Sequence, residues 1–245
     1  MMCYKGGPMS TYVMSDLHGD YEGYIEILKK IHFSDEDVLY INGDVIDRGS
    51  GGIKILQHMM MQPNIYPILG NHEYAAGTCL RFLMKEISEE SIAGIDENII
   101  SNLLEWQNIG GQATLDAFHK LSRDEKEDIV DYLDEFTLYE EATVNGKYFV
   151  IVHAGLTNFS VDRSLDDYEI YELIFEAPDY NKVYFQNKYL VTGHLPTRVI
   201  EGNSRPDKIY IHNNHIVIDC GAGYDGCVGC ICLDTMEEFY STVKK

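Results

Sequence analysis

The chain has 245 residues, with 40 acidic and 19 basic side chains, and its formal net charge is −21 at pH 7. This field repels phosphate backbones, so we expect no nucleic-acid partner, and we interpret most of the surplus carboxylates as a solvated acidic surface. No apolar run is long enough to span a bilayer, so we expect no membrane partner. Residues 1–10 lack the apolar core of a signal peptide, which favours a cytoplasmic location with reduced cysteines. The sequence gives no indication of oligomeric state.

The first third of the chain alternates β-prone runs with helix-like segments. Short apolar runs occupy Thr11–Ser15, Val38–Asn42 and Ile65–Leu69, and helical spacing follows the first two, over Tyr21–Ile31 and Gly52–Met61. This alternation predicts an α/β sheet, whose ligands bind beyond the carboxyl ends of the strands. Each of the three runs ends in a polar motif, in order SDLHGD, GDVIDRG and GNHE.

The pattern changes to helical between about residues 74 and 141. Four helices are expected, over Thr78–Ile87, Glu97–Gln107, Gly111–Leu121 and Asp124–Phe136. We interpret this segment as a helical insertion or cap within a single domain that covers residues 1–245.

The β-prone pattern returns after the helical segment. Strands are expected at Glu141–Val144, Lys147–Val152, Tyr189–Thr192, Ile209–His212, Ile216–Asp219 and Gly229–Leu233. The pair Asn145-Gly146 predicts a hairpin between the first two. The second and third of these strands end in histidine motifs, HAG at His153 and GHLP at His194.

The polar motifs carry side chains suited to metal and phosphate chemistry. Asp16 and His18 are two residues apart, so in an extended segment both side chains reach one ion. Asp44 directly follows the second strand and is placed to bridge two ions. Asp47 can orient a histidine, and the planar guanidinium of Arg48 can bind phosphate oxygens.

Adjacent side chains diverge at a strand-to-helix turn, so the Asn and His of the GNHE motif are expected to have different roles. We assign Asn71 to a metal ion and His72 to acid–base chemistry. Glu73 is expected in the first turn of the next helix, where a carboxylate is favoured. The strand-end histidines His153 and His194 complete the set.

Each motif has an ordinary structural interpretation when it stands alone. A DxH pair occurs by chance, DRG can be a turn with an ion pair, and a histidine at a strand end is usually structural. Recurrence at five strand ends favours a joint site. We interpret the Cys227-x-x-Cys230 pair as part of a buried strand, and the remaining histidines as structural or solvent-facing: His32, His58, His119, His212 and His215.

These motifs, in this order, resemble the calcineurin-like metallophosphoesterase superfamily, and specifically its bacterial serine/threonine phosphoprotein phosphatase-like branch. The resemblance covers residues 11–233, including the closing GAGYDGCVGCICLD and the segment WxxxGGQAT at 106–114. It implies an α/β fold, a four-layer α/β/β/α sandwich with a dinuclear metal site at one edge.

The resemblance also implies a role for each matching residue. Asp16 and His18 match ligands of the first metal, Asp44 the bridging ligand, and Asn71, His153 and His194 ligands of the second. His72 matches the general acid, with Asp47 orienting it, and the substrate-binding residues are Arg48, Asn71 and His72. A hydroxide shared by two metal ions would attack phosphorus while His72 protonates the leaving group. The nitrogen and oxygen ligands suit manganese first, and also iron or zinc.

One segment departs from the pattern of this branch. Many bacterial relatives carry Trp-x-Arg after HAG, and its arginine gives a second contact to phosphate, whereas residues 173–177 here read LIFEA. Glu176 therefore stands beside the missing arginine, either weakening phosphate binding or lying on a rearranged surface loop. Arg81, Arg163 or Arg198 could replace the missing side chain.

Three functions follow from the sequence. The leading one is a phosphomonoesterase that acts on phosphoserine or phosphothreonine in proteins, or on small phosphoesters. The alternative is a dinucleoside polyphosphate hydrolase, which the HAG and GHxP patterns also resemble. A non-catalytic scaffold ranks last, because it predicts lost ligands and every ligand position is filled.

Overall fold

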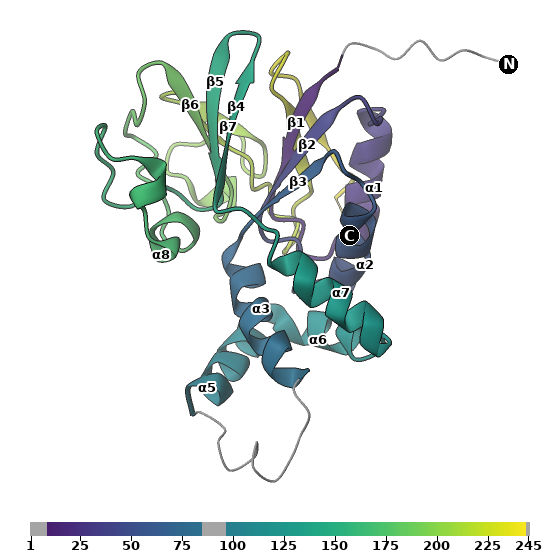
Figure 1. The fold of residues 1–245 in the computed structure, drawn as a ribbon. Helices are drawn as coiled ribbons and strands as arrows, with labels where there is room; N and C mark the ends of the chain where they lie inside the picture. The colour runs from purple at the N-terminus through teal and green to yellow at the C-terminus, as the bar shows by residue number, and fades with distance from the viewer. Residues whose placement is uncertain (1–8, 85–96, 244–245) are drawn as a thin grey trace, which may run out of the picture.

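Two five-stranded mixed sheets pack face to face in the computed structural model, which describes residues 9–84 and 97–243 (Figure 1). The strand orders are β10-β9-β1-β2-β3 and β4-β5-β6-β8-β7. The first sheet comprises β1 (Thr11–Met14), β2 (Val38–Asn42), β3 (Ile65–Ile68), β9 (Gly229–Cys232) and β10 (Glu238–Tyr240). The second comprises β4 (Tyr139–Val144), β5 (Lys147–Val152), β6 (Lys188–Thr192), β7 (Tyr210–His212) and β8 (His215–Val217).

The sheet pairing brings the carboxyl ends of several strands to one edge. Strands β1, β2 and β3 are parallel, as are β5, β6 and β8 in the second sheet. Antiparallel β9 and β10 extend the first sheet beside β1. The loops that follow β1, β2, β3, β5 and β6 can therefore meet where the sheets pack.

The helices lie outside the sheets. They are α1 (Tyr21–Lys30), α2 (Gly52–Met60), α3 (Asn71–Leu83), α5 (Glu97–Trp106), α6 (Gln112–Phe118), α7 (Arg123–Leu133) and α8 (Ile170–Ile174). A π-helical turn, η1 (Gln107–Gly111), joins α5 to α6, and 3-10 turns occupy η2 (Leu165–Asp167) and η3 (Thr197–Val199). In Figure 1, α1 and α2 cover the first sheet and α8 lies beside the second.

Successive side chains along a strand point to opposite faces of its sheet, and this alternation separates the core into layers. In β5, Phe149 and Ile151 pack between the sheets, whereas Val150 and Val152 pack on the outer face with residues that include Leu173 of α8. A third cluster joins the first sheet to its helices. The predicted four-layer sandwich is confirmed, although its fourth layer consists mainly of loops and the short α8.

Several element boundaries differ from the prediction. Helix α3 begins at Asn71 rather than Thr78, because the Glu73 carboxylate accepts the Gly70 N–H and caps its first turn. The predicted end of that helix, Ile87, lies outside the described residues. Strand β10 was not predicted, since its three residues are too short for a periodic pattern.

The described cysteines are unpaired and buried, including Cys227 and Cys230. Cys230 lies within β9, where its side chain contributes to the core. The interpretation of this CxxC pair as structural therefore agrees with its surroundings.

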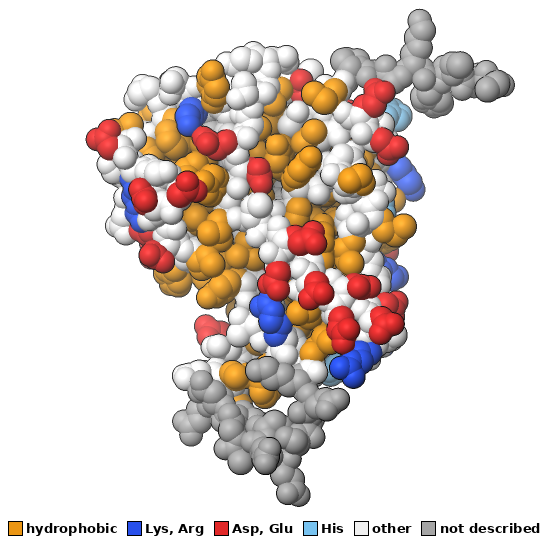
Figure 2. All heavy atoms as spheres, viewed as in Figure 1, with side chains coloured by type: hydrophobic (Ala, Val, Ile, Leu, Met, Phe, Trp, Pro, Cys, Tyr) orange, Lys and Arg blue, Asp and Glu red, His pale blue; other side chains and the backbone are white. Residues whose placement is uncertain are grey.

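Acidic side chains gather on the outer face of α7 and its C-terminal end (Figure 2). The exposed acidic residues there are Asp124, Glu125, Glu127, Asp128, Asp131, Asp134 and Glu135. Much of the negative charge is thus solvated, as the composition suggested. None of the helices within residues 9–84 and 97–243 combines the length and apolarity that crossing a bilayer requires.

Replacement of Ile231 by alanine tests the packing between the sheets. Ile231 is fully buried in β9, so the change leaves a cavity and should lower the free energy of unfolding by about 2–5 kcal/mol. Urea denaturation measures the change. The control Ile211→Ala removes a side chain that is 42% exposed and should stay within about 0.5 kcal/mol of the parent. Equal losses for both variants would contradict this account of the core.

Candidate active site

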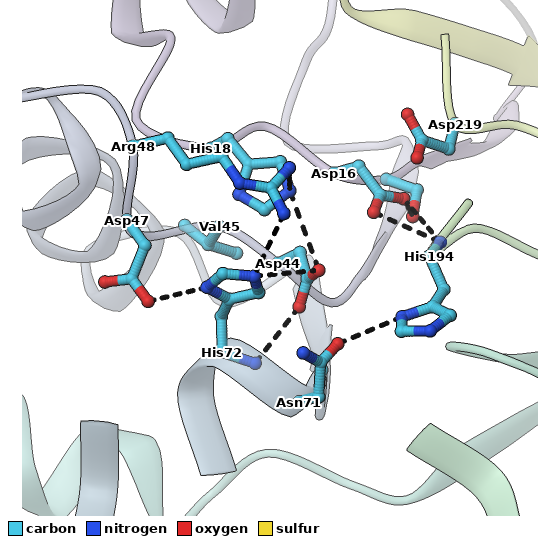
Figure 3. A network of polar contacts seen from close by, with 12 residues as sticks. Asp16, His18, Asp44, Val45, Asp47, Arg48, Asn71, His72, His194 and Asp219 are labelled. Carbon is cyan, nitrogen blue, oxygen red and sulfur yellow. Dashed lines mark hydrogen bonds and ion pairs between the residues drawn. The ribbon is translucent and has the colours of Figure 1, made fainter. Parts of the chain in front are cut away.

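The residues expected at the site converge from both sheets (Figure 3). Asp16 and His18 follow β1, and Asp44 follows β2. Backbone hydrogen bonds join these two loops, since the N–H of Asp16 donates to the Gly43 carbonyl at 3.0 Å and the N–H of His18 to the Asp44 carbonyl at 2.9 Å. The loops after β1 and β2 are therefore held in register.

Asp44 lies at the centre of two groups of potential metal ligands. Its Oδ2 is 3.6 Å from Nε2 of His18 and 3.9 Å from Nε2 of His72, and its Oδ1 is 3.3 Å from Nε2 of His153. In each group, His18–Asp44–His72 and Asp44–His153–His194, the ligand atoms lie within 4.8 Å of one another. One carboxylate thus faces both groups, as a bridging ligand must.

Asn71 closes the second group. Its Oδ1 is 3.1 Å from Nε2 of His153 and 3.0 Å from Nδ1 of His194. His194 comes from the loop after β6, and its imidazole also hydrogen-bonds the Phe175 carbonyl. Side chains from the two sheets therefore meet around a single point.

The histidine hydrogen bonds show that this arrangement fits a cation. A carbonyl oxygen can only accept, so Nδ1 of His153 donates to Asn42 at 2.9 Å and Nδ1 of His18 donates to Ile46 at 3.2 Å. In a neutral imidazole this leaves the Nε2 lone pair of His153 directed at the oxygens of Asp44 and Asn71, while Nε2 of His18 faces both Asp44 and the Arg48 guanidinium. Such acceptors repel one another unless a cation lies among them. The nitrogen and oxygen donors suit manganese, iron or zinc.

The buried carboxylates also indicate that a cation fits this site. Burial, and next Asp219, hold the pKa of Asp16 well above its usual range. Burial opposes protonation of His153, yet Asp44, a hydrogen bond to Asp44 and the charge of Asp16 together raise its pKa to about 10. The site therefore attracts positive charge. Asp219, which was not singled out in the sequence, is buried beside it, and burial raises its pKa to about 7.

Asp16 lies slightly apart from the two ligand groups. Its carboxylate accepts hydrogen bonds from the Ser15 hydroxyl and from the His194 backbone N–H, the latter at 3.0 and 3.1 Å. These contacts tie the loop after β1 to the loop after β6, so Asp16 also connects the sheets.

His72 and Asp47 form a short hydrogen-bonded pair. Nδ1 of His72 lies 2.6 Å from Oδ2 of Asp47. Burial lowers the pKa of His72, but the charge of Asp44 and the hydrogen bond to Asp47 outweigh it, so the pKa is raised. The guanidinium of Arg48 lies 2.9 Å from Nε2 of His18 and 3.4 Å from Nε2 of His72. His72, a member of the first ligand group, is thus also held by Asp47, and the Arg48 cation lies against both histidines of that group.

The helical segment between β3 and β4 holds Asp47 in place. Trp106 Nε1 donates to Oδ2 at 2.8 Å, and the Thr114 hydroxyl donates to Oδ1 at 2.6 Å while accepting the Asp47 N–H at 2.9 Å. The Arg48 N–H donates to the Gly110 carbonyl at 3.0 Å. The WxxxGGQAT segment therefore positions Asp47 and, through the Asp47–His72 hydrogen bond, His72.

Glu73 has a larger role than the sequence suggested. It does lie in the first turn of α3, but its buried carboxylate also accepts the N–H groups of Asp44 and Val45, each at 2.8 Å, and of Ile46 at 3.1 Å. It therefore fixes the backbone that presents Asp44. Burial, and next the charge of Asp44, raise its pKa to about 7.

Left-handed backbone conformations cluster at the site. The residues with positive φ include Asp16 (52°), His18 (42°), Asp44 (54°), Asp47 (70°), Arg48 (63°) and His194 (71°). Such angles are uncommon outside glycine and persist where surrounding contacts enforce them. Gly43, at 77°, is required for a second reason, because a Cβ there would collide with the His153 ring.

The arginines considered as replacements are engaged in ion pairs elsewhere. Arg81 pairs with Asp134, Arg163 with Glu172, and Arg198 with Asp207 and Asp225. Glu176 is exposed on the segment after α8. Arg48 is thus the arginine that the structure places against the ligand groups.

Comparison with known proteins assigns the family. Residues 9–224 match the calcineurin-like phosphoesterases. The chain belongs to the calcineurin-like phosphoesterase family. Its sequence is also similar to symmetrical bis(5'-nucleosyl)-tetraphosphatases, at 39% identity over 67 residues in Buchnera aphidicola and 36% over 67 residues in Salmonella newport. These matches cover 26% of this phosphoesterase and only 24% of each relative.

Solved structures share the fold of this phosphoesterase. One, provisionally assigned as a diadenosine tetraphosphatase, has a TM-score of 0.63 at 15% identity and aligns over 99% of this chain and 97% of its own. A serine/threonine phosphatase from Saccharomyces cerevisiae with similarity to human PP5 has a TM-score of 0.58 at 13% identity, over 97% and 81%. At these identities the likeness establishes the fold alone.

Replacement of Thr114 by valine tests the support of Asp47. The change keeps the shape of the side chain but leaves an Asp47 oxygen and the Asp47 N–H without this partner, so the free energy of unfolding should fall by about 1–3 kcal/mol. Turnover of any ester should fall as well, with metal content unchanged. The control Thr143→Val, on an exposed position of β4, should alter neither quantity. Unaltered stability and turnover in Thr114→Val would contradict the proposed support.

Proposed function

We propose that this phosphoesterase hydrolyses phosphate monoesters with the aid of two metal ions, manganese being our first choice. The observation that carries the proposal is that two groups of potential ligands share Asp44, while His72, a histidine of the first group, is held by Asp47. Asp16, His18 and Asp44 would hold one ion, and Asn71, His153 and His194 with Asp44 the other. Bound ions would supply a water of lowered pKa and neutralise phosphate charge.

The chain's own residues provide proton transfer and substrate binding. His72, whose pKa is raised by Asp44 and Asp47 against the effect of burial, is placed to donate a proton to the departing oxygen. Asp47 fixes the orientation of the ring through the 2.6 Å hydrogen bond. Arg48 would bind the non-bridging phosphate oxygens with its planar donors, and the Asn71 amide would orient the ester.

Phosphoserine and phosphothreonine in proteins are the leading substrates in this proposal. The GDVIDRG and GNHE motifs support them, because both resemble the protein phosphatase branch. The family assignment is compatible with this choice and does not select it. A small aryl phosphate should serve as a convenient substrate in vitro. A cytoplasmic location is part of the same proposal.

Dinucleoside polyphosphates are the second candidate. The observation that favours them is the 67-residue similarity to tetraphosphatases. Side-by-side measurement of kcat/KM with a phosphoserine peptide and with diadenosine tetraphosphate separates the two. We expect the peptide to be preferred, and preference for the dinucleotide would replace the leading substrate.

Replacement of His72 by asparagine tests the general acid. Loss of the proton donor should lower kcat by about 10²–10⁴-fold, most strongly for esters with poor leaving groups. Metal analysis should give the same content in variant and parent after saturation with manganese. The control His119→Asn changes an exposed histidine at the end of α6 and should leave kcat unchanged.

Two results would contradict the proposal. Retention of full kcat by His72→Asn would remove His72 from catalysis. Fewer than two bound ions in the saturated parent would argue against the dinuclear site. A parent that binds metal but turns over no ester would instead favour the scaffold interpretation.

A further inference from the structure

A polar pocket of about 330 Å³ adjoins the active site on the Arg48 side. Three segments line it, residues 18–22, 48–54 and 222–226. His18 and Arg48 line this pocket and also belong to the candidate active site, so the pocket lies directly beside it. The proposed function gives no role to the other residues that line the pocket.

Lys54 adds a second cation to the pocket. It lies in the first turn of α2, where the helix dipole disfavours a positive charge. That turn contains no acidic residue, and its N-cap, Gly51, provides no side-chain cap. An anion beside Lys54 would relieve this unfavourable placement. Arg81, Arg163 and Arg198 are engaged in ion pairs elsewhere, whereas Lys54 lines this pocket together with Arg48.

Two tyrosine rings hold the cations at the wall of the pocket. The Arg48 guanidinium lies 4.5 Å from the centre of the Tyr224 ring, and Nζ of Lys54 lies 6.0 Å from the centre of the Tyr21 ring. Contacts of this kind restrain a cation without cancelling its charge. Both side chains therefore keep their ability to bind an anion.

The two carboxylates that line the pocket stabilise the N-terminus of α1. Asp20 is its N-cap and accepts the Gly23 N–H at 2.9 Å, and Glu22 lies in its first turn. Both positions favour negative charge, so these carboxylates have a structural reason to be there. Lys54, by contrast, is exposed and places a positive charge in a first helical turn, where the helix dipole disfavours one.

We propose that the pocket holds a second phosphate of the substrate, between Arg48 and Lys54, while the scissile phosphate lies at the ligand groups. This inference rests on the proposed phosphoester hydrolysis and adds to it a preference for substrates that carry a second phosphate. The second phosphate can belong to the phosphate chain of a nucleotide or to a neighbouring phosphoserine. Both sources present a phosphate group to Lys54, singly charged within a dinucleotide's phosphate chain and largely dianionic on phosphoserine.

Charge reversal at Lys54 tests the proposal. Lys54→Glu is compared with Lys147→Glu, which makes the same charge change at the exposed start of β5. The values of kcat/KM are measured with 4-nitrophenyl phosphate, a singly phosphorylated peptide, the same peptide with adjacent phosphoserines, and diadenosine tetraphosphate. Lys54→Glu should lower kcat/KM at least about tenfold for a substrate with more than one phosphate, because a charge-assisted contact is lost. The two singly phosphorylated substrates should change less than about twofold.

The pattern of losses identifies the source of the second phosphate. A selective loss with the dinucleotide supports the proposal with a phosphate chain as the ligand, and a selective loss with the doubly phosphorylated peptide supports it with a neighbouring phosphoserine. Equal losses for all substrates, or no loss beyond that of Lys147→Glu, would overturn it.

A binding measurement keeps this test separate from the test of catalysis. In the His72→Asn background, calorimetry with excess manganese gives the Kd of diadenosine tetraphosphate and of the doubly phosphorylated peptide without turnover. Addition of Lys54→Glu should raise at least one Kd about tenfold or more. Unchanged Kd values for both would reject the pocket even if hydrolysis is confirmed. Weakened binding would support it even if the parent hydrolyses neither ligand.

Discussion

The carboxylate of Glu73 binds three consecutive backbone N–H groups, and the geometry of the active site depends on this contact. Asp44 and the two residues after it turn away from β2 in conformations that leave their N–H groups without strand or helix partners, and an interior N–H cannot remain unpaired without cost. Glu73 supplies the acceptors from the first turn of α3. The same side chain therefore sets the end of β2, the start of α3 and the position of the central carboxylate between its histidines.

The hydrogen bonds of Asn42 connect the backbone around Asp44 to the second sheet. Its carbonyl accepts the Ser15 hydroxyl at 2.8 Å and the His153 imidazole at 2.9 Å, and its amide donates to the Val152 carbonyl at 3.0 Å. A residue of β2 thus binds groups at the ends of β1 and β5. Because the ligands are shared between sheets, the packing that stabilises the fold also sets the distances within the site.

The sequence predicts the parts of this site that are local in the chain. Strand ends followed by Asp, His and Asn are visible as motifs, and parallel pairing brings them together. The supporting contacts are not visible in this way, since Asp47 and Thr114 are 67 positions apart and the geometry that joins them depends on the whole helical segment. Lys54 was missed for a related reason, because one lysine in an amphipathic helix is usually a solvated side chain. Short β10 carries too few residues for a period to be recognised.

The order of the ligands along the chain has a consequence for synthesis. Asp16, His18, Asp44 and Asn71 leave the ribosome before the helical segment, whereas His153 and His194 leave after it. An emerging chain therefore displays four of the six residues proposed as metal ligands, and under that assignment its affinity for metal would stay low until the second sheet docks. On the proposed assignment, tight metal binding would therefore coincide with completion of the fold.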